Sequence, residues 1–160
     1  MAKHAIGRHP AEREREIWFL KKLLEAAKDG HISVLTSTIT IAECQHANGV
    51  ADDQVQRLFR GILTSGQYVV LVQDTVLVAE RARDLRWVHN IALDGADAVH
   101  VASALEMGCV EFITSDGRIL GRAQELAALG LRVVSALDTG YLPAEYRQEN
   151  LLQPGVGPDG

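Results

Sequence analysis

The chain has 160 residues, of which 47% are hydrophobic and 23% are charged. This composition is typical of a globular protein long enough for one domain with a substantial core, and it excludes a disordered chain. The net charge of −5 gives no sign of a broad basic surface for nucleic-acid backbones. It does not exclude a nuclease, because an acidic metal site is itself negative until its cation binds.

Targeting signals and cysteines also limit the possibilities. Residues 1–10 contain no apolar stretch of signal-peptide length, and no apolar run approaches the roughly 18 residues of a membrane span. Cys44 and Cys109 lie far apart without a CxxC pattern, so we expect two buried free thiols rather than a disulfide. We therefore expect a soluble, cytoplasmic protein with no membrane association.

Helical and strand-like segments alternate along the chain. The apolar stripe of Ile17, Leu20 and Leu24 predicts a helix over 11–28, and a β-branched run predicts a strand over 32–36. The later predictions are a helix capped by 37–38 and running to 48, helices over 52–63, 76–88, 96–107 and 119–129, and strands over 68–72, 110–114 and 131–135. This order predicts an α/β fold with a mostly parallel sheet covered on both faces.

Three regions follow from this reading. Residues 1–10 form an irregular N-terminal segment, residues 11–140 form the folded domain, and residues 141–160 form a C-terminal tail that carries Pro and Gly near its end.

Three carboxylates occupy equivalent positions in the alternation. Glu43 lies on the helix after the first strand, Asp97 begins a helix, and Asp116 follows a buried strand. The carboxyl ends of parallel strands open onto one rim of a sheet, where ligands bind. Clustered carboxylates repel unless a cation neutralises them, and hard oxygen ligands select Mg²⁺ or Mn²⁺ over zinc. Each acid also has a plain structural reading, as a helix-terminus, turn or solvated helix residue.

Neighbouring polar residues could support such a site. Asp94, one helical turn before Asp97, is either a supporting ligand or an ordinary loop acid before a helix. Ser37 either lines a cleft near Glu43 or caps the helix that carries it. We expect His100 to be packed or hydrogen-bonded rather than a general base, because metal-assisted hydrolysis needs no strong base.

Three stretches of this sequence carry a family resemblance. They are Thr36-Ser-Thr-Ile-Thr-Ile-Ala-Glu43, Asp94-Gly-Ala-Asp-Ala-Val-His-Val-Ala-Ser-Ala-Leu105 and Phe112-Ile-Thr-Ser-Asp116. In this order they resemble the successive signatures of PIN-domain ribonucleases, most closely those of VapC-like bacterial toxins, over roughly residues 11–140. The resemblance implies a three-layer α/β/α sandwich. It also implies Glu43, Asp97 and Asp116 as catalytic, metal-binding carboxylates, with Thr114 as a hydroxyl beside the site.

One part of the family pattern is missing. The pattern opens with a central strand that ends in Asp, whereas residues 1–10 contain no acidic residue and no strand-like run. Neighbouring strands would then keep unpaired backbone groups, each costing about 1–3 kcal/mol if buried. We expect either that the natural product begins about 10–20 residues further upstream, one strand plus a turn, or that the domain is degenerate. The coding sequence upstream of Met1 would decide between the two.

The resemblance leads to an expected function. We expect an endoribonuclease dependent on Mg²⁺ or Mn²⁺, the toxin of a type II toxin–antitoxin system, impaired where the first acidic residue is absent. The expected partners are an RNA substrate, an antitoxin protein that covers the acidic cleft, and a second copy in a homodimer. The alternative is a catalytically inactive PIN-like module that binds protein or RNA. A receiver-like phosphotransfer domain is a third reading, but the phosphoacceptor Asp and late Lys that it requires are not evident.

Overall fold

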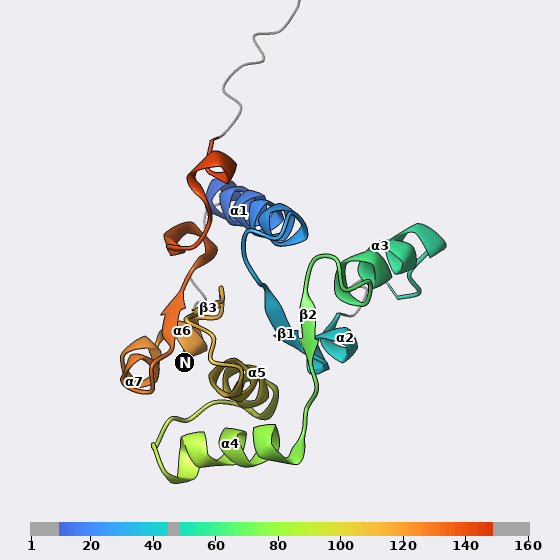
Figure 1. Ribbon diagram of the computed structural model, residues 1–160. Coiled ribbons are helices and arrows are strands. Elements are labelled where there is room, and N and C mark those ends of the chain that lie inside the picture. Colours follow the sequence, from blue (N-terminus) through green and yellow to red (C-terminus); the bar gives the residue numbers. More distant parts are fainter. Residues whose placement is uncertain (1–9, 45–48, 149–160) are drawn as a thin grey trace, which may run out of the picture.

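A computed structural model describes residues 10–44 and 49–148 of the chain (Figure 1). The helices are α1 (Pro10–Lys28), α2 (Ile39–Glu43), α3 (Asp53–Leu63), α4 (Val76–Trp87), α5 (Gly95–Glu106), α6 (Gly117–Leu120) and α7 (Ala123–Ala128). The strands are β1 (Leu35–Ser37), β2 (Val70–Val72), β3 (Glu111–Ile113) and β4 (Arg132–Val134), and two 3-10 turns follow, η1 (Ala136–Asp138) and η2 (Ala144–Tyr146).

The four strands pair as two separate parallel sheets. β1 pairs with β2, with Leu35 opposite Val70, and β3 pairs with β4, with Glu111 opposite Arg132. Within residues 10–44 and 49–148 no strand pairing joins the two sheets, and Figure 1 shows them standing apart. The predicted α/β class with parallel strands is therefore confirmed, but these residues form two strand pairs where one sheet was expected.

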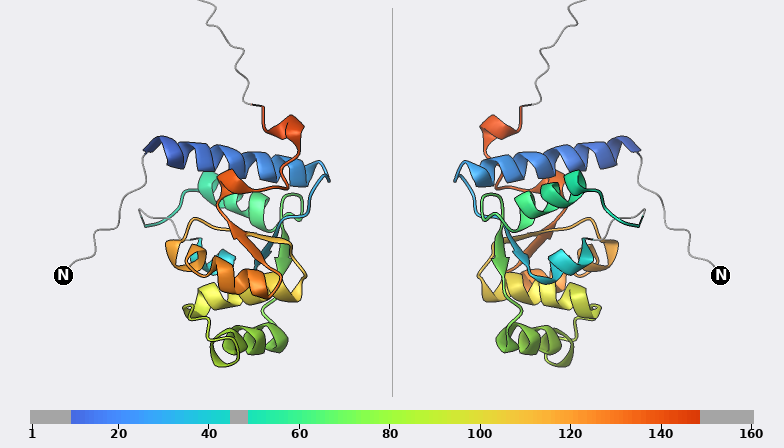
Figure 2. Two further views of the ribbon diagram at one scale, coloured as in Figure 1. Left: turned by 90° about the vertical axis from the view of Figure 1, so that its left-hand side faces the viewer. Right: turned by 90° about the vertical axis from the view of Figure 1, so that its right-hand side faces the viewer.

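Two apolar clusters hold these elements together. The larger cluster joins α4, α5 and α7 to β4 through buried side chains that include Leu85, Val101, Leu126 and Val133. The smaller cluster packs Phe19, Leu23 and Ala26 of α1 against Ala136 and Leu142 near the C-terminal end of the fold. Figure 2 shows α1 at one end of the molecule and α4 and α5 at the other. Burial of apolar surface at about 25 cal/mol per Å² stabilises both ends.

The segment predicted as one helix over 119–129 is divided into two. α6 ends at Leu120 and α7 begins at Ala123. Gly121 lies at the break, where an added Cβ would come within 3.1 Å of the Gly117 carbonyl oxygen. Glycine is also a poor residue for a helix interior, so the first helix ends there.

The first strand and the helix after it differ from the prediction in their bounds. The strand begins at Leu35 rather than at residue 32, because pairing with β2 starts there. Ile32 instead packs against the smaller apolar cluster. The following helix, predicted to reach residue 48, ends at Glu43, and residues 45–48 lie outside the described part of the chain.

The cysteines and the membrane prediction can also be compared with the structure. Both thiols are free, as predicted, but neither is buried: Cys44 is exposed and Cys109 is half-buried. In the parts of the chain that the structure describes, no helix combines the length and the apolar character that crossing a membrane requires.

Candidate functional site

Two of the predicted acids lie at the start of α5. Asp94 immediately precedes the helix, and Asp97 lies in its first turn, where a negative charge is favoured by the helix dipole. The Asp97 side chain is only 18% exposed, whereas the Asp94 side chain is 75% exposed. Asp97 is thus the inner carboxylate of the pair and Asp94 the outer one.

Asp116 reaches the same place from the end of β3. Its backbone N–H donates to Thr114 Oγ1 at 3.0 Å, and its own Oδ1 accepts from the Arg118 backbone N–H at 2.7 Å. These two hydrogen bonds fix the turn from β3 into α6, with Asp116 as the N-cap residue. Thr114 thus orients the turn that carries Asp116.

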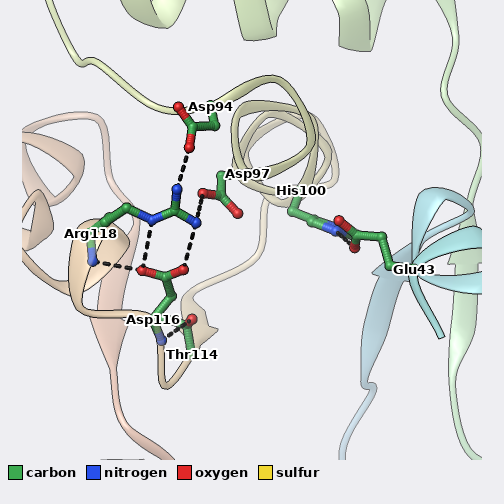
Figure 3. Close-up of polar contacts among 7 residues, drawn as sticks. All are labelled: Glu43, Asp94, Asp97, His100, Thr114, Asp116 and Arg118. Atoms are coloured by element: carbon green, nitrogen blue, oxygen red, sulfur yellow. Dashed lines mark hydrogen bonds and ion pairs between the residues drawn. The ribbon is translucent and has the colours of Figure 1, made fainter. Parts of the chain in front are cut away.

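A single guanidinium group joins the three aspartates, as Figure 3 shows. Arg118 Nη1 donates to Asp94 Oδ2, while Nη2 lies 3.0 Å from Asp116 Oδ2 and 3.1 Å from Asp97 Oδ2. The sequence reasoning missed Arg118. The available signal was its place two residues after Asp116, within the same turn. Three carboxylates therefore share one cationic side chain.

The aspartates differ in how well their charge is compensated. Burial raises the pKa of Asp97; the Arg118 charge opposes this, and the Asp116 and Asp94 charges add to it. In contrast, hydrogen bonds from the Arg118 side chain and backbone lower the pKa of Asp116. Asp97 Oδ2 is buried and has no hydrogen-bond partner in the described structure, because Arg118 Nη2 is close but poorly aligned. Asp97 is the least compensated of the three.

Glu43 lies on the other side of α5 from Arg118 (Figure 3). Its Oε2 is 2.6 Å from His100 Nε2, one helical turn after Asp97. His100 is hydrogen-bonded, as expected. The structure thus brings Asp97 and Asp116 together at Arg118 and places Glu43 at His100. Among the residues that the structure describes, no three His, Cys, Asp or Glu side chains are spaced to hold one metal ion.

Ser37 supports the fold beneath Glu43 rather than contacting it. Its buried Oγ donates to Asp74 Oδ1 at 2.6 Å, and Thr38 Oγ1 donates to Asp74 Oδ2 at 2.6 Å. Asp74 follows β2 and so ties that strand to the turn between β1 and α2. The sequence reasoning missed this role for Asp74, although an acid just beyond a strand was the same signal that marked Asp116.

Replacing Asp74 by Ala should lower the free energy of unfolding by about 1–2 kcal/mol, since the buried Ser37 hydroxyl loses its acceptor. Urea unfolding measures this loss. In a double-mutant cycle with Ser37→Ala, the two effects should be less than additive. Strictly additive effects would show that the hydrogen bond contributes nothing.

A surface hollow of about 410 Å³ opens beside the aspartates. Its polar lining residues are Asp94, Asp97, Arg118 and Arg122. The carboxylate oxygens, among them the buried Asp97 Oδ2 that lacks a hydrogen-bond partner, suit a hard divalent cation. Asp97 and Asp116 are the residues that would hold it, and the arginines suit an anionic substrate.

Comparison with known proteins identifies the family of this chain. The PIN domain family model matches residues 6–126, a span that includes Glu43, Asp97 and Asp116. No match was found among curated proteins or among solved structures. PIN domains are typically nucleases and usually use divalent metal ions. Since the matched span covers well over half of the sequence, the chain belongs to the PIN domain family.

Proposed function

We propose that this protein is an endoribonuclease dependent on Mg²⁺ or Mn²⁺, of the VapC-like branch, acting as the toxin of a type II toxin–antitoxin system. The observation that carries the proposal is the meeting of Asp97 and Asp116 beside the hollow. These two carboxylates come from α5 and from the end of β3, and they share a single cationic partner, Arg118. RNA as substrate, an antitoxin as protein partner and a homodimer belong to the same proposal.

Each residue of the site has a distinct part in this chemistry. Asp97 and Asp116 would hold the cation through carboxylate oxygens, and Thr114 keeps the Asp116 turn in place. A divalent cation, when bound, stabilises the charge that develops on a phosphoryl oxygen during cleavage. Arg122, on the wall of the hollow, contacts the RNA phosphates, for which a planar guanidinium is well suited.

Glu43 and a further strand complete the proposed site. Glu43 is hydrogen-bonded to His100 on the other side of α5, and it would have to give up that bond to join Asp97 and Asp116. We further propose a strand between β1 and β3 that carries a fourth carboxylate and unites the sheets into a three-layer sandwich. The support is that, in the described residues, β1 pairs only with β2 and β3 only with β4.

Cleavage of labelled single-stranded RNA by the purified protein tests the proposed activity. We expect cleavage with Mg²⁺ or Mn²⁺, none in the presence of EDTA, and a severe loss in Asp97→Asn and Asp116→Asn. Asp53→Asn is a matched control, because it removes the same charge from the first turn of α3. Cleavage that survives both Asp97→Asn and Asp116→Asn would overturn the proposed site.

The alternative is an inactive module that binds RNA or protein. The favouring observation is that the acids are already paired within the chain, with Arg118 and His100. RNA binding without cleavage, at the same affinity with and without Mg²⁺, would support this module and contradict the nuclease.

A further inference from the structure

Arg118 lies between the two carboxylates that are proposed to hold the cation. Its Nη2 atom alone bridges them, 3.1 Å from Asp97 Oδ2 and 3.0 Å from Asp116 Oδ2. A divalent ion shared by these oxygens would sit between them as well, at about 2.0–2.6 Å from each ligand. The guanidinium nitrogen and the ion cannot both occupy that space.

We propose that Arg118 is a built-in counter-ion of the acidic site, and that a divalent cation binds only when the Arg118 guanidinium leaves Asp97 and Asp116. This inference rests on the proposed function, because it concerns the same two carboxylates. It assigns Arg118 a regulatory role, in which the side chain sets the cation concentration at which the site fills.

The charges around Arg118 favour such an exchange. Asp94, Asp97 and Asp116 bring three negative charges to one guanidinium. The single positive charge of Arg118 therefore does not neutralise the three aspartates. A divalent ion supplies twice the charge of Arg118. It can also satisfy Asp97 Oδ2, which Arg118 approaches without forming a hydrogen bond.

The exposed position of Arg118 gives its side chain room to leave the aspartates. The side chain is 63% exposed and extends from α6, a helix of only four residues. The pair with Asp94 is exposed and contributes little to stability, whereas Asp97 is only 18% exposed and Asp116 is held by two side-chain N–H groups of Arg118. Apart from the three aspartates, no ion pair in the described residues involves Arg118, so nothing else among these contacts has to break.

Titration of Mn²⁺ into the full chain, followed by calorimetry or by electron paramagnetic resonance of the free ion, tests the exchange. If Arg118 occupies the site in nine of ten molecules, its removal should tighten the apparent affinity about tenfold. We therefore expect Arg118→Gln to bind Mn²⁺ about tenfold more tightly than wild type, with Arg118→Lys in between. Arg60→Gln is the matched control, because it removes the same charge from α3 and should leave the affinity unchanged.

A second measurement follows Arg118 itself in the wild-type protein. Addition of diamagnetic Mg²⁺ should move the Arg118 Nε–Hε resonance to the position of a solvent-exposed arginine. An Arg118→Gln variant that binds Mn²⁺ no more tightly than wild type, or more weakly, would overturn the exchange and leave the nuclease proposal standing. Failure of both proteins to bind Mn²⁺ would instead overturn the metal-dependent function and the exchange together.

Discussion

Replacing Asp97 by Asn should lower the Mg²⁺-dependent rate of RNA cleavage by at least about 100-fold. Mutation of a residue that merely supports a metal ligand lowers metal affinity or activity by about 10–100-fold, so mutation of a direct ligand should lower activity further. Asn keeps the shape of the side chain and removes the charge that attracts the cation. Single-turnover cleavage with saturating protein measures the effect on the chemical step. A rate within a few-fold of wild type would exclude Asp97 from the site.

The same substitution should not harm the fold. Asp97 is 18% exposed and has an oxygen without a hydrogen-bond partner, so its neutral replacement should leave stability unchanged or raise it by up to about 1 kcal/mol near neutral pH. Loss of cleavage with retained stability would separate a functional role for Asp97 from a structural one.

The stability difference should also depend on pH. Burial raises the pKa of Asp97 above the ordinary aspartate value near 3.9, so its contribution to stability is fully present below that value. The contribution is lost as the pH rises through the raised pKa. The gain in stability from Asp97→Asn should therefore appear at pH values above the raised pKa of Asp97 and vanish at pH values below the ordinary aspartate pKa. Urea unfolding from about pH 4 to about pH 8 measures it; an advantage that grows toward acid pH would have the wrong sign.

Replacing Glu111 by Ala should destabilise the fold by about 3 kcal/mol, because removing one partner of a buried ion pair costs about 3–5 kcal/mol and Arg132 is partly exposed. The Glu111 side chain is only 5% exposed. It accepts hydrogen bonds from Arg132, from Thr139 Oγ1 at 2.7 Å and from the Gly140 backbone N–H at 3.1 Å. Its loss leaves these donors without their acceptor, and Thr139 is itself buried.

Denaturant unfolding measures this loss, with Glu25→Ala as the matched control. Glu25 forms an exposed ion pair with Lys22 on α1, so its removal should cost no more than about 1 kcal/mol. Since Glu111 begins β3 and Asp116 follows its end, loosening of this strand should also weaken metal binding. Equal losses of unfolding free energy in Glu111→Ala and Glu25→Ala would show that the burial of Glu111 adds nothing to the stability that its ion pair provides.

The part of the site on one helix and one strand end could be predicted from the sequence. Asp97 in the first turn of α5 and Asp116 just beyond β3 are positioned by local structure, and the structure brings both to Arg118. The position of the Glu43 carboxylate relative to Asp97 and Asp116 depends on how β1 and α2 lie relative to α5. The pattern of residues in the sequence does not determine that arrangement. In the structure its carboxylate meets His100 instead.

Arg118 was not predicted, because its place two residues after Asp116 does not by itself determine the direction of its side chain. An arginine after a turn is ordinarily a solvated surface residue, and Arg118 is indeed 63% exposed. Only the turn geometry set by Thr114 and Asp116 directs its guanidinium toward α5.

The fold was predictable to a similar extent. Apolar periodicity located the long helices α1, α3, α4 and α5, because each buries or displays a regular stripe over several turns. The short elements were harder, since three-residue strands are defined by their pairing partners rather than by their own residues. The break at Gly121 reflects the low helix propensity of glycine, which the spacing of apolar residues does not indicate.

The location of a bound divalent ion is the most direct test of whether Asp97 and Asp116 form a metal centre. In ¹⁵N-labelled protein, substoichiometric Mn²⁺ broadens the amide signals closest to the ion. The amides of Asp97, Asp116 and Arg118 should broaden first, while those of α1 and α3 remain sharp. Broadening that centres on another acidic pair, such as Asp52 and Asp53 at the start of α3, or that spreads evenly over the acidic surface, would contradict a metal centre at Asp97 and Asp116.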